Sequence, residues 1–292
     1  MDRSILNGLI DIHVHAGPSV ANRAVDAAEM LKEAEAAGYR GFLVKDHYFP
    51  SMMGCQMVEK HMGNGTCEIF GSMCLNNAVG LFNLNAVDAA YGMGAKIIYF
   101  PTVSSKNHID AHKGGFAGAG KMSVPETPVV YIDENGELLP EAVRVLEYMA
   151  EKDITLGTGH GSAKEIDALV RKAVEVGVKK ILVNHPHFHI GATYEQMKEW
   201  VKLGAFIELN VCVFKEGSIL GPLETSVLED MLREIPHDRM VLDSDMGQKG
   251  NGSPVEGMYN FICLMADRYG ITEDEIDVMA KKNPAYLMGL DA

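Results

Sequence analysis

One pattern recurs along the 292-residue chain: an amphipathic helical stretch, a glycine, and then a short apolar run rich in β-branched residues. It is clearest at residues 27–45, 84–100, 170–185 and 194–209. Glycine is favoured just after a helix because the residue there often takes a positive φ. Short apolar strands of this kind are typical of parallel strands that helices cover. The repeat therefore predicts a fold in which strands and helices alternate.

Similar runs elsewhere bring the number of predicted strands to eight. They lie at residues 8–15, 39–47, 67–75, 96–102, 153–160, 179–187, 204–212 and 239–245. Eight such units in a chain of this length favour a single (β/α)8 TIM barrel domain over residues 1–292, with a doubly wound open sheet as the alternative. The longest connection, residues 103–140 after the fourth strand, predicts a lid-like insertion that contains a hairpin turn at Asn135-Gly136.

Charge and cysteine content narrow the classes of partner. The formal net charge is −14, which disfavours nucleic acid and anionic membrane surfaces as partners. The five cysteines lack zinc-finger or CxxC spacing, and the N-terminus lacks a signal-peptide pattern. We therefore expect a cytoplasmic protein that acts on a small molecule. A homo-oligomer is expected only because such assemblies are common.

Two histidines end the first predicted strand, in the segment DIHVHAGP at 11–18. Residues two apart in a strand share a face, so His13 and His15 are predicted to face the barrel interior, and Ile12 and Val14 to pack under helices. The active sites of such barrels lie at the C-terminal ends of the strands. Two buried imidazoles need partners, so the pair predicts a metal site or two hydrogen-bonded core histidines.

Three other predicted strands end on metal-ligating residue types. His160 ends the fifth strand, His185 ends the sixth with His187 on the same face, and Asp245 ends the eighth. Histidine and carboxylate ligands that leave an open position are typical of catalytic sites for zinc and related ions. These strand ends therefore predict a site for a divalent cation.

This arrangement resembles the amidohydrolase superfamily of metal-dependent hydrolases over essentially the whole chain, including the closing segment KKNPAYLMGL at 281–290. The resemblance implies that His13, His15 and Asp245 bind the more buried metal ion. It also implies that Asp245 receives a proton from the metal-bound water.

The same resemblance implies that His160 and His185 bind a second ion or hold the substrate. Two-metal members of the superfamily often bridge their ions with a carboxylated lysine or a glutamate at the end of the fourth strand. The fourth predicted strand here ends in KIIYFPTVSS, with neither residue at its end. The number of ions per chain, one or two, therefore remains open.

The second predicted strand offers a substitute. Lys45 and His47 are expected to share its inward face. Lys45 could be carboxylated and bridge two ions, pair as a cation with a substrate carboxylate, or form an ion pair inside the protein. The candidate ion-pair partners are Asp11, Glu208 and Asp243.

The predicted site residues fall into two further groups. Asp245, Lys45 and His185 are the predicted catalytic residues. The predicted substrate contacts are Lys45, His47, His187, Asn76, Asn210, Gln248 and, from the insertion, His108. Glu208 and Asn210 alternate with apolar neighbours, so both are expected to face inward.

The sequence thus predicts a metal-dependent hydrolase that attacks a C–N or C–O acyl bond with metal-bound hydroxide. A cyclic amide, imide, lactam or lactone is the expected substrate class. Zn²⁺ is the expected ion, and Mn²⁺, Fe²⁺ and Ni²⁺ suit the same ligands. The alternatives are a mononuclear decarboxylase or C–C hydrolase of the same fold, a phosphoesterase, and a non-catalytic metal-binding barrel.

Overall fold

The centre of the molecule is one sheet of eight parallel strands, each paired with the next along the chain. The computed structural model describes residues 1–113, 115–116, 120, 122–188, 190–220 and 223–291. The strands are β1 (Ile10–Val14), β2 (Gly41–Val44), β3 (Glu68–Cys74), β4 (Ala95–Tyr99), β5 (Thr155–Gly157), β6 (Ile181–Val183), β7 (Phe206–Asn210) and β8 (Met240–Asp243). A parallel bridge between Val14 and Met246 joins the last strand to the first. The predicted (β/α)8 barrel is confirmed, and the doubly wound alternative is wrong.

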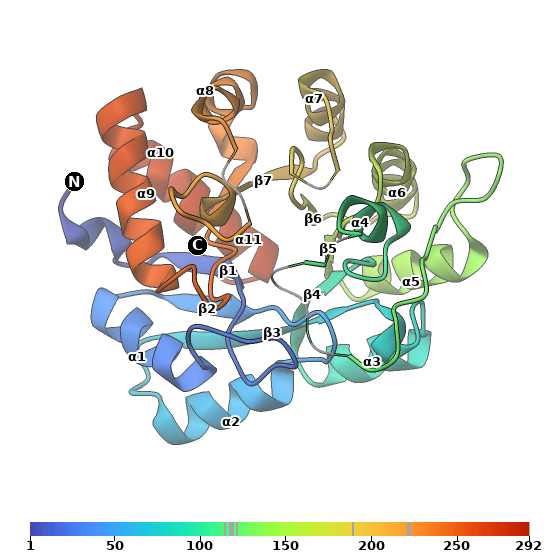
Figure 1. Cartoon of the computed structure of the whole chain (residues 1–292), viewed down its shortest axis with the longest axis horizontal. Coiled ribbons are helices and arrows are strands. Elements are labelled where there is room, and N and C mark those ends of the chain that lie inside the picture. Colours follow the sequence, from blue (N-terminus) through green and yellow to red (C-terminus); the bar gives the residue numbers. More distant parts are fainter. Residues whose placement is uncertain (114, 117–119, 121, 189, 221–222, 292) are drawn as a thin grey trace.

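Helices connect successive strands and surround the sheet (Figure 1). They are α1 (Ala27–Ala37), α2 (Met52–Met62), α3 (Leu84–Gly92), α4 (Lys106–Ala111), α5 (Pro140–Glu151), α6 (Ala163–Glu175), α7 (Tyr194–Lys202), α8 (Thr225–Glu234), α9 (Pro254–Tyr269), α10 (Glu273–Asp277) and α11 (Asn283–Met288). The glycines of the repeat, Gly38, Gly94, Gly177 and Gly204, all have positive φ just after a helix, as predicted. Local residues also determine where helices begin: Asp26 and Glu29, for example, form a capping box at the start of α1.

The buried apolar residues form two separate layers. The outer layer lies between the sheet and the helices and contains, for example, Val14, Phe42 and Val44. The inner layer fills the lower barrel and is closed by residues of α11; its strand members are Ile10, Ile12, Leu43, Phe70, Cys74, Ile97, Tyr99, Leu182, Phe206 and Val241. The polar inward-facing residues therefore lie above a packed apolar floor, near the C-terminal ends of the strands.

The alternation predicted for β1 is wrong at Ile12. The pairing of β1 with β2 shifts between Asp11, opposite Phe42, and Val14, opposite Val44. Two residues of β1 therefore oppose one residue of β2, which is a β-bulge. Ile12 packs in the inner layer and not under a helix. The bulge lets the next residue, His13, also face the interior, so the irregularity aims a site residue.

Within the insertion at 103–140, a parallel bridge pairs Ser105, just before α4, with Val129. An antiparallel bridge between Ile132 and Leu138 encloses Asn135-Gly136, as expected of the predicted hairpin turn. Asn77, outside the insertion, donates its amide N–H groups to Glu126 Oε2 at 2.7 Å and Thr127 O at 2.9 Å. Several residues of the insertion, at 114, 117–119 and 121, lie outside the described residues.

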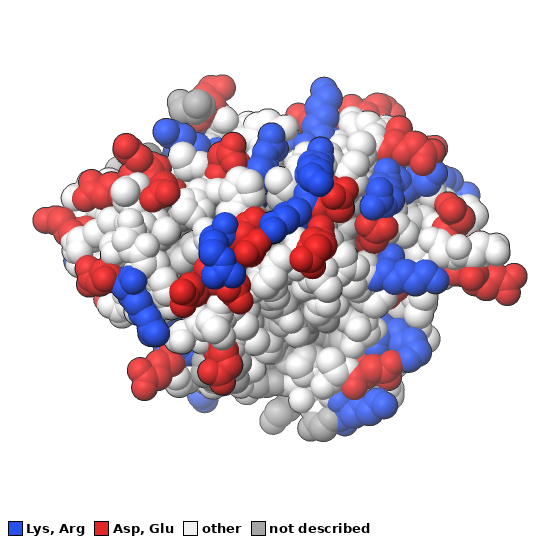
Figure 2. Space-filling view, turned by 90° about the horizontal axis from the view of Figure 1, so that it is seen from above, with Lys and Arg blue, Asp and Glu red and all other residues white. Residues whose placement is uncertain are grey.

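The surface carries both signs of charge. Figure 2 shows one face of the molecule on which Lys and Arg side chains are interspersed with Asp and Glu side chains around an uncharged area. Within the described ranges, no helix is both long enough and apolar enough to cross a membrane.

Candidate metal centre

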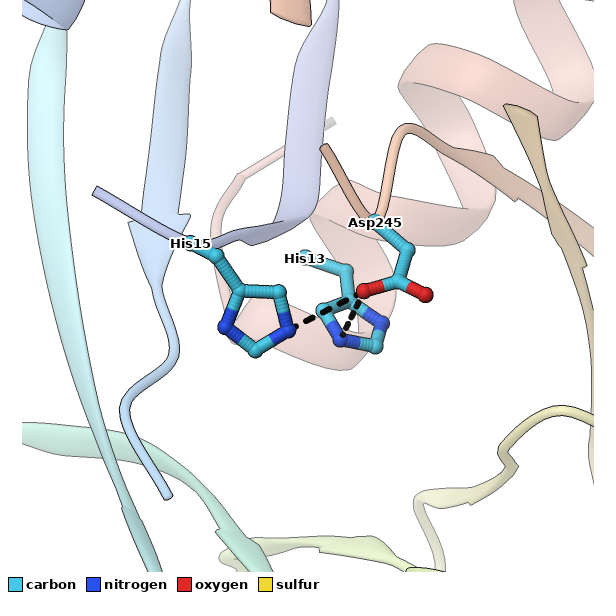
Figure 3. A group of neighbouring side chains, drawn as sticks. All are labelled: His13, His15 and Asp245. Atoms are coloured by element: carbon cyan, nitrogen blue, oxygen red, sulfur yellow. Dashed lines mark ion pairs between the residues drawn. The ribbon is translucent and has the colours of Figure 1, made fainter. Parts of the chain in front are cut away.

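Three predicted ligands meet at one point above the barrel floor. Asp245 Oδ1 lies 3.1 Å from His13 Nε2 and 3.0 Å from His15 Nε2 (Figure 3). All three residues are buried, and their ligand atoms lie within 4.8 Å of one another. Two nitrogen donors and one oxygen donor at this spacing suit a divalent transition-metal ion.

The other ring nitrogens fix the tautomers of the two histidines. His15 Nδ1 lies 2.9 Å from the carbonyl oxygen of Lys45, which can only accept a hydrogen bond, so Nδ1 carries the proton. His13 Nδ1 donates to Glu208 Oε1 at 2.9 Å. Each Nε2 lone pair is thereby turned toward Asp245. Carboxylate and carbonyl partners behind metal-bound histidines are a recurring feature of metal sites.

This donor set fits a cation, because two imidazole nitrogens and a carboxylate oxygen converge on one point, where the Lys45 side-chain nitrogen lies 3.0 Å from His13 Nε2. Burial lowers the pKa of His15 to about 3, so its ring is neutral at pH 7 and does not supply the positive charge itself. Burial alone would raise the pKa of Asp245, but His13, His185 and His15 hold that pKa well below its ordinary value. The carboxylate is therefore ionised.

Lys45 lies beside this group, within the barrel. Its ammonium nitrogen is 3.0 Å from His13 Nε2 and 4.5 Å from the centre of the Tyr99 ring. Among the described residues it makes no ion pair with Asp11, Glu208 or Asp243, so that alternative is wrong. The ring contact suits an ammonium group. Lys45 is fully buried and is not one of the residues that line the cavity beside Asp245.

Two site residues have left-handed backbone conformations. His185 has φ of 46° and Asp245 has φ of 44°, values that are uncommon for residues other than glycine. Such conformations cost free energy and cluster at functional sites. The Asp245 carboxylate is further fixed by two donors, with Cys212 Sγ 2.9 Å from Oδ2 and Gln248 Nε2 3.4 Å from Oδ1. No pattern in the sequence pointed to Cys212.

Glu208 and Asn210 face inward as predicted, and both support histidines. Asn210 Oδ1 accepts from His185 Nδ1 at 2.9 Å. Glu208 Oε1 also accepts from Asn184 Nδ2 at 2.8 Å, and Oε2 accepts from the backbone N–H of His185 at 3.0 Å. His13, His185 and Glu208 form a second group with metal-like spacing. Because Glu208 already accepts these hydrogen bonds, we assign it to support and not to a second ion.

His160 belongs to neither group, but the structure brings it close to the site. Its ring centre lies 5.0 Å from that of His185 and 5.8 Å from that of His47. His108 of the insertion stacks on it at 5.0 Å, with the two Nδ1 atoms 3.0 Å apart. His47 Nδ1 lies 2.9 Å from Thr102 Oγ1. His47 and His160 thus flank the three ligands, and the insertion reaches the site.

A small cavity of about 10 Å³ opens beside Asp245. This is close to the least space that a water molecule needs. It is lined by His15, Arg23, His47, Phe116, His160, His185, Leu220, Asp245 and Gln248. A larger pocket of about 560 Å³ lies under the insertion, and Phe116 and Tyr48 are among its walls. Phe116 lines both spaces and so separates the inner cavity from the outer pocket.

Two predicted substrate contacts lie elsewhere. Asn76 donates to His47 O and Thr102 Oγ1 and accepts from the backbone N–H groups of Thr102 and Ser104, so its hydrogen-bonding groups are used inside the protein. The prediction that His187 shares a strand face with His185 is wrong, because β6 ends at Val183. The His187 ring packs 5.0 Å from Tyr194 and does not line the cavity.

Arg23 is a cavity residue that the sequence analysis missed. It lies in the segment that leaves β1, eight positions after His15, and its side chain is only 4% exposed. The signal was its place after the first strand, since active sites form at that end of the barrel.

Comparisons with known proteins agree on the fold. Organophosphorus hydrolase from Deinococcus radiodurans matches with a TM-score of 0.59 and 17% identity, over 99% of this chain and 94% of that one. An amidohydrolase from Pseudomonas aeruginosa matches with a TM-score of 0.62 and 10% identity, over 98% and 97% of the two chains. An organophosphate hydrolase engineered from a weak promiscuous lactonase template matches with a TM-score of 0.60 and 16% identity, over 99% and 98%.

These matches confirm the resemblance to the amidohydrolase superfamily at the level of the fold. No curated protein sequence matches the chain. The model of a family of unknown function, DUF6282, matches residues 8–208, which is more than half of the sequence. The protein therefore belongs to the DUF6282 family.

Proposed function

We propose that this protein is a metal-dependent hydrolase of small molecules that holds one divalent cation with His13, His15 and Asp245. The observation that carries the proposal is that Nε2 of His13 and Nε2 of His15 both lie next to Asp245 Oδ1. The hydrogen bonds of the two Nδ1 atoms fix both tautomers. A single ion is favoured because the other group with metal-like spacing depends on Glu208, which already accepts hydrogen bonds. The likeness in fold to known hydrolases supports the proposal.

A bound divalent cation would lower the pKa of a water molecule, so that hydroxide is available as the nucleophile at neutral pH, and would polarise the attacked bond. The chain's own residues do the rest. Asp245 is ionised and lies at the site, so it can accept a proton and pass it to the leaving group. His185, held by Asn210, and His160 line the cavity, where they can contact the substrate oxygen. Phe116 and Leu220 limit the entry of bulk water.

The proposed substrate class is a cyclic amide, imide, lactam or lactone with a C–N or C–O acyl bond. The lactonase template among the structural neighbours supports this class. Phosphotriester hydrolysis is the second candidate, because organophosphorus hydrolase shares the fold. We propose Zn²⁺ as the ion. We also propose the cytoplasm as the location, since all five cysteines are free.

The test is a hydrolysis screen on purified protein before and after treatment with a chelator. The panel contains lactones, cyclic amides, phosphotriesters and a carboxylate substrate for decarboxylation. We expect hydrolysis of at least one acyl or phosphotriester substrate that chelation abolishes and metal addition restores. Hydrolysis that survives complete metal removal would contradict the proposal.

A further inference from the structure

We propose that Arg23 binds an anionic group of the substrate, a carboxylate or a phosphoryl group, at the edge of the metal site. This inference rests on the proposed function, because it places the anion beside the residues that hold the metal. It follows from the contacts of the guanidinium group, from the way the loop is fixed, and from the composition of the cavity wall.

The buried guanidinium group of Arg23 has N–H donors that no protein acceptor uses among the described residues. Its Nη2 lies 3.3 Å from Ser19 Oγ and 3.6 Å from Asp46 Oδ2. Its Nε and Nη1 are buried and have no hydrogen-bond acceptor among the described residues. A buried donor without an acceptor costs free energy, so native proteins rarely keep one without a reason. An anion in the adjoining cavity would satisfy these donors.

Asp46 does not use up the charge of Arg23. Its Oδ1 accepts from the backbone N–H groups of Tyr48, at 2.8 Å, and Phe49, at 3.1 Å. Its Oδ2 accepts from the Ser19 hydroxyl. The carboxylate thus has three other hydrogen-bond donors and meets only one nitrogen of the guanidinium group, whose Nε and Nη1 are available to a ligand.

The loop that carries Arg23 is fixed to the loop that carries Asp245. Arg23 and Gln248 form an antiparallel bridge. The backbone N–H of Ala24 donates to Gly247 O at 2.7 Å. Gly247 has φ of 111°, and a Cβ there would lie 2.3 Å from His15 O, so glycine is required at this contact. The backbone that carries the guanidinium group is therefore held in place before any ligand binds, which favours recognition.

The cavity wall offers an anion one strong partner. Among its described lining residues, Arg23 is the one Lys or Arg side chain. Lys45, predicted to contact a substrate carboxylate, does not reach this wall. The inner cavity is small, and Phe116 and Leu220 form apolar parts of its wall. A compact anionic group therefore fits the site better than a large one.

The direct test measures anion binding without any need for turnover. The probes are succinate, inorganic phosphate and, as a neutral match for succinate, succinamide. Each is titrated calorimetrically into metal-loaded wild type, R23Q, R23K and R144Q at constant ionic strength. R144Q is the matched control, because Arg144 is an exposed arginine on α5. We expect R23Q to bind succinate or phosphate at least about tenfold more weakly than wild type, because a charged hydrogen bond is lost.

We also expect R144Q to match wild type, and succinamide binding not to depend on Arg23. Loss of succinate binding identifies a carboxylate site, and loss of phosphate binding alone identifies a phosphoryl site. Equal binding of both anions by wild type and R23Q would overturn the inference. If R23Q does not fold, wild type and R23K are compared instead. The unfolding temperature of each protein is measured with each anion and with chloride as the reference. A rise that R23K reduces supports the inference, and equal rises overturn it.

Metal content and hydrolysis, measured on the same samples, separate this inference from the proposed function. If hydrolysis depends on metal but anion binding does not depend on Arg23, the anion-site inference is overturned and the proposed function stands. Anion binding that depends on Arg23 in a protein that holds no metal would overturn the proposed function and leave the anion site standing.

Discussion

At the scale of single residues, the site depends on groups that hold ligands as much as on the ligands. Glu208 accepts a hydrogen bond from Nδ1 of His13, and the carbonyl oxygen of Lys45 accepts one from Nδ1 of His15. Asn210 accepts one from Nδ1 of His185. Each partner decides which ring nitrogen carries the proton. A lone pair is thereby directed into the site before a cation arrives, and we expect the loss of such a partner to weaken metal binding.

Replacing Glu208 by Gln tests this support directly. E208Q keeps the shape of the side chain but removes the charge that fixes the His13 tautomer. We expect metal affinity to fall by about 10- to 100-fold, because outer partners of metal ligands have effects of this size. Titration with Zn²⁺ against a competing chelator measures it. E229Q, at an exposed position of α8, is the control; equal affinities in the two variants would contradict the assigned role.

His108 predicts a specific pH dependence of stability. Burial lowers its pKa to about 3, below the ordinary value near 6.5. Above pH 6.5 the ring is neutral in both the folded and the unfolded chain. As the pH falls from 6.5 toward 3, the unfolded chain binds a proton that the folded chain does not, so the free energy of unfolding decreases.

The variant H108Q should therefore lose part of this acid sensitivity. We expect the slope of the free energy of unfolding between pH 6 and 4 to decrease by up to about 1.4 kcal/mol per pH unit. Urea unfolding at several pH values measures the slope. H61Q, at an exposed position of α2, should leave it unchanged. Identical slopes in wild type and H108Q would show that His108 is not buried in its neutral form.

At the scale of elements, the insertion after β4 lines the space beside the site. Phe116 lines both the inner cavity and the outer pocket, and its ring lies 4.8 Å from that of His108. Asn77 and Glu126 tie the later part of the insertion to the barrel. The insertion therefore has a fixed base and presents one aromatic partition to the metal centre.

Removing that partition should open the site. F116A would join the two spaces, so we expect a chelator to remove the metal about tenfold faster, which equals a barrier lower by about 1.4 kcal/mol. A time course of metal loss after mixing with chelator measures the rate. F49A, which truncates an exposed phenylalanine elsewhere, should match wild type. An unchanged rate in F116A would contradict the partition.

Alternation along strands predicts the site well wherever the strands are regular. Lys45, Glu208 and Asn210 face inward as the two-residue period requires. It fails at Ile12, because a bulge depends on how β1 pairs with β2, which one strand's own sequence does not reveal. It fails at His187 because β6 stops at Val183. Arg23 was missed because a bridge to Gln248, far away in the sequence, brings it to the site.

At the scale of the whole molecule, barrel closure brings the first and last strands together at the site. Ser244 N donates to Asp11 Oδ1 at 3.0 Å, and His15 N donates to Met246 O at 2.8 Å. The proposed ligands His13 and His15 come from one side of this seam and Asp245 from the other. A cation that binds all three therefore also joins the two ends of the sheet.

Metal removal should accordingly destabilise the whole barrel. A ligand at about 100 times its Kd stabilises the folded state by about 2.7 kcal/mol. For a chain of this size, we expect the unfolding temperature to drop by roughly 5 °C or more after chelation and to recover after metal is added back. Calorimetry of loaded and chelated samples measures it. Equal unfolding temperatures would contradict a metal site at the seam.

The metal content of the purified chain and of its D245N variant tests the proposed cation site without any need for a substrate. Elemental analysis after loading and desalting should find about one divalent ion per chain in wild type and in the surface control D267N, because three protein ligands hold it. It should find less than about a tenth of an ion in D245N, because one of the three proposed ligands is lost. Equal metal content in wild type and D245N, or no ion in a folded wild type, would contradict the account.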